Sequence, residues 1–128
     1  MTLTHASTHE LTERIIGAAI EVHRHLGPGL LESTYEECLC FELEEALISV
    51  SRQPLLPVIY KGRKLHGCYR PDLVIENKVI VEIKTVEKLV DIHTAQVLTY
   101  IRHSNTKIGL LFNFNSKTLV EGMKRISL

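Results

Sequence analysis

The order of patterned segments along the chain predicts an α/β fold in which a mixed central β-sheet is flanked by α-helices. Two helical segments come first, several short strand-like segments follow, and a further helix and strand complete the chain. This order is typical of a mixed sheet covered by helices. The length of 128 residues, with 45% hydrophobic and 23% charged residues, suits one folded domain. We therefore expect a single domain over residues 1–128, with residues 1–7 as a flexible N-terminal tail.

The first two helices are predicted from their start and stop signals. Residues 7–10 (Ser-Thr-His-Glu) have the spacing of a capping box, and apolar residues then recur at helical intervals as far as Leu26. The sequence Gly27-Pro28-Gly29 ends this helix, because glycine accepts the left-handed conformation and proline cannot continue the ladder. A second helix is expected from about Leu31 to Leu47. Its candidate buried residues are Leu31, Tyr35, Cys38, Leu39 and Leu43.

Strand-like segments occupy the middle and the end of the chain. Residues 50–60 alternate in character despite two prolines, and a turn at residues 61–63 leads into a strand over residues 64–69. Asp91 is expected to be the N-cap of a third helix that reaches His103. A strand over residues 107–113 follows, and then a short strand or helix over residues 119–126.

The segment from Arg70 to Lys84 reads as a β-hairpin with charges at its open end. Residues 73–75 and 79–81 are apolar runs separated by the polar triplet Glu76-Asn77-Lys78. A turn centred on Asn77 sets Asp72 directly opposite Glu82, where like charges repel. Lys84 projects from the same face as Glu82, because side chains alternate along a strand.

This charged group has two interpretations. Charges at strand ends are ordinary, and a surface Glu82–Lys84 pair would contribute only about 0–1 kcal/mol. However, Glu82 lies within an apolar run that predicts a strand covered on both faces, where a lone carboxylate needs a partner. A divalent cation between Asp72 and Glu82 is the simplest such partner.

Three motifs in order resemble those of a known nuclease superfamily. Pro71-Asp72, nine further residues and then Glu82-Ile83-Lys84 resemble the PD-(D/E)XK signature of that superfamily. The segment from Gly29 to Tyr35 is similar to the pattern that names the small GxxExxY family, one of its branches. Gln96 to Tyr100 resembles the QxxxY helix motif of the RecB-like branch. Together these motifs imply a restriction-endonuclease-like core.

The resemblance also implies a catalytic site. Asp72 and Glu82 would bind Mg²⁺, for which Mn²⁺ can substitute, and the backbone carbonyl of Ile83 would be a further ligand. Lys84 would orient or deprotonate the attacking water, or stabilise the charge that develops on the phosphate. Glu32 would reach the metal from an early helix; its alternative role is that of an ordinary first-turn Glu stabilised by the helix dipole.

Three further residues are candidates for nucleic-acid binding or for support of the site. Tyr35 lies one turn after Glu32 and could hydrogen-bond to it, although packing of its ring is the expected role. Gln96 and Tyr100 belong to a polar and aromatic stripe on the third helix, together with His93 and His103. The apolar packing face of that helix is expected to consist of Ile92, Ala95, Leu98 and Ile101.

Bulk properties exclude several classes of protein. No apolar stretch approaches the roughly 18 residues of a membrane span, and residues 1–10 lack the pattern of a signal peptide. Three cysteines without a Cys-x-x-Cys pair indicate reduced thiols and not a disulfide framework or a zinc knuckle. No serine hydrolase, phosphate-loop or dinucleotide motif is present. We expect a cytoplasmic protein without a membrane partner.

The overall charge is neutral, with 15 Lys and Arg against 15 Asp and Glu, so no strong field attracts nucleic acid to the whole protein. Two groups of cations have two interpretations each, as a local basic strip or as scattered solvated charges: Lys61, Arg63 and Lys64, and Lys84, Lys88 and Arg102. The expected function is Mg²⁺-dependent hydrolysis of phosphodiester bonds, with DNA as the substrate. The alternatives are a non-enzymatic module that binds nucleic acid or a protein partner, and a metal-dependent hydrolase of small molecules. A homodimer or larger complex would help so small a core to hold DNA.

Overall fold

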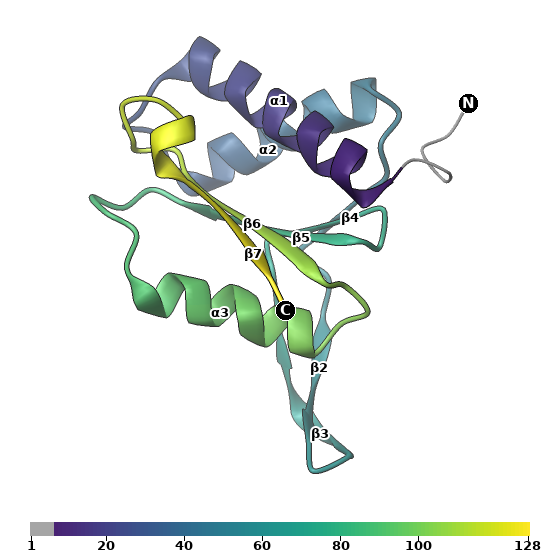
Figure 1. Ribbon diagram of the computed structural model, residues 1–128. Coiled ribbons are helices and arrows are strands. Elements are labelled where there is room, and N and C mark those ends of the chain that lie inside the picture. Colours follow the sequence, from purple (N-terminus) through teal and green to yellow (C-terminus); the bar gives the residue numbers. More distant parts are fainter. Residues whose placement is uncertain (1–6) are drawn as a thin grey trace.

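The computed structural model describes residues 7–128; residues 1–6, which make up most of the expected N-terminal tail, lie outside the described residues. A central β-sheet has α1 and α2 on one face and α3 on the other, and the hairpin of β2 and β3 projects past α3 (Figure 1). This arrangement confirms the predicted α/β class with a mixed sheet flanked by helices.

The first helix, α1 (Thr8–Leu26), has the predicted bounds. The Glu10 N–H donates to Ser7 Oγ at 3.1 Å, which satisfies one of the amides left free at the helix start. At the other end Gly27 adopts a φ of 68°, a left-handed conformation that glycine accepts without strain. The expected stop signal therefore acts as predicted.

The second helix, α2 (Glu32–Glu45), is shorter than expected at both ends. Leu31 is its N-cap, in an extended conformation, and the Leu31 side chain is 73% exposed. The expectation that Leu31 is buried was wrong, because a residue before the first turn does not share the direction of the helix's apolar face. Cys38 is only half-buried, whereas Tyr35, Leu39 and Leu43 are fully buried as predicted.

The main sheet has the strand order β1-β4-β5-β6-β7. Only β5 and β6 are parallel; the other neighbours are antiparallel. The strands are β1 (Val50–Arg52), β4 (Leu73–Ile75), β5 (Val79–Lys84), β6 (Ile108–Asn113) and β7 (Met123–Ser127). Residues 119–126, predicted as a short strand or helix, contain both: the short 3₁₀ helix η2 (Val120–Gly122) leads directly into β7.

The predicted strand over residues 50–60 is two strands in two different sheets. β1 belongs to the main sheet, whereas β2 (Leu56–Tyr60) pairs only with β3 (Arg63–Tyr69). Gln53, with a φ of 46°, and Pro54 interrupt the extended chain between them. We call residues 56–69 the arm, because this two-stranded hairpin extends away from the main sheet (Figure 1).

The sheet is buried on both faces, as the apolar run in β5 predicted. On one face, Val79, Val81 and Ile83 pack into the core formed with α1 and α2. On the other face, Ile80 packs with the α3 residues Val97, Tyr100 and Ile101. Glu82 is two residues from Ile80, so its side chain starts from the α3 face of the sheet.

The third helix, α3 (Asp91–Arg102), differs from its prediction in two respects. Val90 is the N-cap and Asp91 is the first helical residue. The expected packing face was correct for Ile101, which is buried, and for Leu98, which packs half-buried beside it. It was wrong for Ile92, which is 69% exposed, and for Ala95, which is exposed; Val97 and Tyr100 are buried instead. Apolar residues occur on more than one side of this helix, and contact with β6 decides which side is buried.

In the described part of the chain, no helix combines the length and the apolar character that crossing a membrane requires.

Gly109 on β6 allows α3 to approach the sheet closely. A Cβ at this position would lie 2.3 Å from Cγ1 of Val97, a stiff β-branched side chain. We predict that Gly109→Ala lowers the free energy of unfolding by about 1–3 kcal/mol through overpacking. Gly17, within α1, has nothing within 4 Å of such a Cβ, so Gly17→Ala should stabilise the protein by about 1 kcal/mol. Urea denaturation of both variants checks this; a neutral Gly109→Ala would contradict the close approach.

Candidate functional site

Asp72 and Glu82 face each other at the open end of the β4–β5 hairpin. The register pairs Leu73 with Val81, which sets Asp72 opposite Glu82 as predicted. The turn spans Glu76, Asn77 and Lys78. Glu76 and Asn77 have positive φ, and the Lys78 N–H donates to the Ile75 carbonyl at 2.9 Å. This short turn fixes which residues meet at the other end of the hairpin.

Each of the two carboxylates is held by the main chain of the opposing segment. The Asp72 N–H donates to Glu82 Oε1 at 2.7 Å, and the Ile83 N–H donates to Asp72 Oδ2 at 2.7 Å. The two side chains are therefore positioned by backbone geometry, and not by contacts between flexible groups. Among the hydrogen bonds of residues 7–128, none uses Asp72 Oδ1.

Lys84 lies beside this pair on the same face of β5. Its Nζ is 3.6 Å from Glu82 Oε2, and its side chain is 17% exposed, against 5% for Glu82. The Phe114 N–H donates to the Lys84 carbonyl at 2.9 Å, which ties the end of β5 to the chain leaving β6. One ammonium group is thus the nearby positive charge for two largely buried carboxylates.

Burial makes both carboxyl groups weaker acids than usual. It raises the pKa of Glu82 to about 8, with a further increase from the negative charge of Asp72. It also raises the pKa of Asp72 to about 6; the hydrogen bond from Ile83 opposes this rise, and the charges of Glu36 and Glu32 add to it. Ionisation of both carboxyl groups is therefore costly unless a cation lies beside them.

Helix α2 brings two more carboxylates to the same end of the sheet. The Thr85 N–H, just after β5, donates to Glu32 Oε2 at 3.1 Å, so Glu32 reaches the end of β5. Glu36 lies one turn further along α2 and is only 4% exposed. Arg52 at the end of β1 donates to Glu36 Oε2 through Nε at 3.2 Å and through an Nη at 2.9 Å.

The Glu36–Arg52 pair is the part of the site that the sequence analysis missed. Glu36 follows Glu32 by four residues, and positions four apart share one face of a helix, so this spacing was the available signal. Arg52 could not have been assigned, because its proximity depends on the pairing of β1 with β4, in which Arg52 lies opposite Leu73.

Tyr35 is a core residue in this structure. It is fully buried, its ring stacks on Phe114 at 4.5 Å, and its hydroxyl donates to the Gly27 carbonyl at 2.5 Å. The expected packing is therefore observed, whereas a hydrogen bond to Glu32 is not, and a direct role in nucleic-acid binding is incompatible with the burial. The Leu30 N–H also donates to its hydroxyl, so Tyr35 holds the loop before α2.

Helix α3 approaches the site from the other side with Gln96 and Tyr100. Gln96 Nε2 donates to the Tyr100 hydroxyl at 2.9 Å. Burial raises the pKa of Tyr100 to about 12, and the negative charges of Glu82 and Asp72 add to this rise. Tyr100 is only 6% exposed, so the polar and aromatic stripe of α3 is partly buried. The two histidines have local contacts: His93 Nδ1 accepts from the Val90 N–H, and His103 packs edge-on against Tyr69.

The available oxygen atoms suit a hard cation. Within residues 7–128, no three His, Cys, Asp or Glu side chains converge closely enough to hold a metal ion by themselves. Zinc usually requires three or four such ligands, whereas Mg²⁺ is held by one or two carboxylates and keeps several waters. Asp72 and Glu82 therefore fit Mg²⁺ or Mn²⁺ better than they fit zinc.

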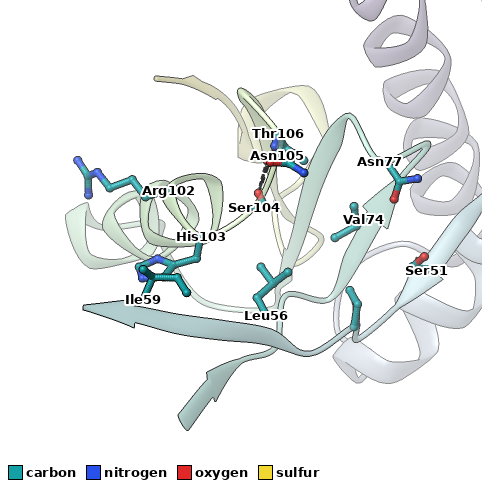
Figure 2. Close-up of a pocket in the computed structure, with 11 residues that line it drawn as sticks. Ser51, Leu56, Ile59, Val74, Asn77, Arg102, His103, Ser104, Asn105 and Thr106 are labelled. Atoms are coloured by element: carbon teal, nitrogen blue, oxygen red, sulfur yellow. Dashed lines mark hydrogen bonds between the residues drawn. The ribbon is translucent and has the colours of Figure 1, made fainter. Parts of the chain in front are cut away.

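The cavity drawn in Figure 2, of about 490 Å³, lies elsewhere, between the arm and the loop that follows α3. Its lining includes Leu56, Ile59, Val74 and His103, and it contains none of the residues predicted for the site. The charged group lies instead at the open end of the β4–β5 hairpin, on two interior strands of the sheet.

A comparison of the sequence with family models gives a match over residues 9–126 to the PD-(D/E)XK nuclease superfamily. The chain belongs to this superfamily. The matched region covers every helix and strand except the first residue of α1 and the last residue of β7. Nuclease activity is thus the family's function, and divalent metals are its general cofactors. Neither the curated proteins nor the solved structures yield a match.

The raised pKa of Glu82 predicts a specific pH dependence of stability in the metal-free protein. Between about pH 4.5 and 8 the folded protein keeps a proton on Glu82 that the unfolded chain releases. The free energy of unfolding should therefore fall as the pH rises through this window, by up to about 1.4 kcal/mol per pH unit for one proton. Glu82→Gln, which cannot ionise, should have a flatter profile.

Urea denaturation in the presence of a chelator, at pH values from 5 to 8, measures this difference. Glu121→Gln, which removes an exposed carboxylate, is the matched control and should follow the wild type. Parallel profiles for the wild type and Glu82→Gln would mean that Glu82 ionises at its ordinary pKa.

Proposed function

We propose that this protein is a Mg²⁺-dependent nuclease that hydrolyses phosphodiester bonds in DNA. The observation that carries the proposal is the fixed group formed by Asp72, Glu82 and Lys84 at the open end of the hairpin, in a chain of the PD-(D/E)XK superfamily. Membership of the GxxExxY branch, a single domain over the whole chain and a cytoplasmic location are parts of the same proposal.

Asp72, Glu82 and the carbonyl of Ile83 would hold the metal. Asp72 Oδ1 and Glu82 Oε2 are the carboxylate oxygens that the opposing main chain leaves available. The N–H and C=O of one strand residue point toward the same neighbouring strand. Because the Ile83 N–H donates to Asp72, the Ile83 carbonyl is directed to the same side. These oxygens suit an ion that keeps some of its waters.

A phosphodiester resists hydrolysis because its negative charge repels nucleophiles. Bound Mg²⁺ would supply positive charge near a non-bridging oxygen and lower the pKa of a bound water. Lys84 is suited to orient or deprotonate the attacking water, or to stabilise charge on the phosphate, because its ammonium lies beside the carboxylates and is partly accessible. Its three donors can contact Glu82 and a phosphate oxygen together.

The other candidates surround this centre. Glu32 would approach the metal from α2, through water, and its hydrogen bond from Thr85 supports that position. Gln96 and Tyr100 would support the site or contact the nucleic-acid backbone from α3, where they form a hydrogen-bonded pair. Tyr35 would act only through the fold, by holding the loop before Glu32.

A non-enzymatic module that binds nucleic acid or a protein partner is the second candidate function. The observation in its favour is that backbone N–H groups already satisfy one oxygen of Asp72 and one of Glu82, so the pair could serve the fold alone. In either function, the small size of the chain favours action as a homodimer or within a larger complex.

Metal binding should stabilise the folded protein. Mg²⁺ or Mn²⁺ relieves the repulsion between Asp72 and Glu82 and binds only to the folded state, so an ion concentration of 100 Kd should add about 2.7 kcal/mol to the free energy of unfolding. Glu82→Ala should abolish this gain. Thermal unfolding with and without millimolar metal measures it, with a chelator as control. An unchanged melting temperature in the wild type would exclude a metal site of useful affinity.

Lys84→Met should separate catalysis from folding and metal binding. Methionine keeps an apolar stem of similar length and removes the charge, so the variant should fold and retain the metal-induced stabilisation. Cleavage should fall by at least about 100-fold if Lys84 stabilises charge in the transition state.

The assay compares wild type and variant on single-stranded, duplex and open-ended DNA and on RNA, with Mg²⁺, Mn²⁺ and a chelator. If the wild type binds one of these substrates and cuts none, the non-enzymatic function replaces the nuclease. Undiminished cleavage by Lys84→Met would instead place the activity at another site or in a contaminant.

A further inference from the structure

The neutral overall charge conceals a strong separation of charge along the chain. Residues 46–71, which contain the whole arm, carry five of the 15 Lys and Arg residues and none of the 15 Asp and Glu residues. Residues 1–45, which contain α1 and α2, carry nine of the acidic residues and only two of the basic ones. A polyanion would therefore be attracted to the arm and repelled from the α1 and α2 face.

The positive charge of the arm is concentrated at its tip. Tyr60 and Arg63 are paired at the end of the hairpin, and Lys61 and Gly62 form the turn, both at positive φ. Lys61, Arg63 and Lys64 are all exposed. The Lys61 ammonium lies 5.4 Å from the centre of the Tyr60 ring, which is itself 59% exposed. No ion pair between described residues involves these three cations, so they are available to phosphates.

The base of the arm is connected to the candidate catalytic residues. β3 ends at Tyr69, three residues before Asp72. The ring of Tyr69 packs 6.0 Å from that of Tyr100, whose hydroxyl bonds to Gln96, and 4.9 Å from that of His103. The base of the arm thus packs against the C-terminal part of α3 and the residue that follows it. The arm itself is directed away from the sheet (Figure 1). The seven residues of β3 span about 20 Å.

We propose that the arm is a clamp for the phosphate backbone of a nucleic acid, with Lys61, Arg63 and Lys64 each neutralising a phosphate. This rests on the proposed function and extends it by assigning the surface that holds the substrate. The length of β3 corresponds to about six nucleotide steps of 3.4 Å along a strand, so the clamp contacts backbone well away from the bond to be cut. The three cations carry no base-edge pattern, so the contact is independent of sequence.

The salt dependence of binding tests the clamp. Each neutralised phosphate of duplex DNA contributes about −0.9 to the slope of log K against log salt. The triple variant Lys61→Gln, Arg63→Gln, Lys64→Gln should therefore have a slope shallower by about 2 to 3. Raising the salt fourfold should weaken wild-type binding by about 40-fold more than it weakens binding by the variant. The probe is a labelled 30-base-pair duplex in chelator, with single-stranded DNA and RNA of the same length as parallel probes.

The matched control removes the same number of charges elsewhere. Arg14→Gln, Arg24→Gln, Lys107→Gln affects exposed cations on α1 and before β6, and should leave the slope within experimental error of the wild type. Circular dichroism and urea denaturation establish that both triple variants are folded. Equal slopes for the arm variant and the wild type, an equal loss in the control variant, or no binding of any probe by the wild type would each overturn the clamp. A change only in the oligomeric state of the arm variant would also overturn it, and would assign the arm to a second copy of the chain.

Cleavage of the same duplex in Mg²⁺ is measured separately from binding. Cleavage by the wild type together with an unchanged slope for the arm variant overturns the clamp and leaves the nuclease proposal standing. Binding that depends on the arm, without cleavage in Mg²⁺ or Mn²⁺, supports the clamp and overturns the nuclease proposal.

Discussion

The register of the β4–β5 hairpin is the constraint on which the rest of this structure depends. Asp72 meets Glu82 because Leu73 pairs with Val81, and a slip of one residue would turn every side chain of β4 to the opposite face. Two features prevent such a slip. Burial of β5 on both faces fixes its apolar side chains, and the parallel pairing with β6 holds the strand from its other edge. The two carboxylates are therefore brought together by packing that they do not themselves favour.

The electrostatic cost of this arrangement is distributed over several elements. Backbone N–H groups bind one oxygen of Asp72 and one of Glu82, and Lys84 lies beside the second oxygen of Glu82. Arg52 pairs with Glu36, so that α2 brings a buried carboxylate to the site together with a counter-charge from β1. Burial, together with the remaining negative charge, raises both pKa values and favours a bound cation. On a larger scale, acidic α1 and α2 and the basic arm divide the surface into regions of opposite sign.

Helix α3 connects the hairpin to the arm. Val97 approaches β6 at Gly109, which sets the depth of the helix against the sheet. The ring of Tyr100 packs 6.0 Å from that of Tyr69 at the base of the arm, and the negative charges of Glu82 and Asp72 add to the rise in the Tyr100 pKa that burial causes. A shift of α3 would consequently move the supporting contacts of the site and of the arm together.

Much of this protein was determined by local sequence signals. Capping and glycine signals gave the bounds of α1, and the apolar runs and polar turn gave the hairpin, with Asp72 opposite Glu82 and Lys84 on the same face. These features depend on residues close together in the chain. The tertiary structure alone decided that residues 50–60 divide between the main sheet and the arm, and that α3 buries Val97 and not Ile92. It also decided that Arg52 reaches Glu36. Each of these outcomes depends on which distant segments pair or pack, and local periodicity carries no information about that choice.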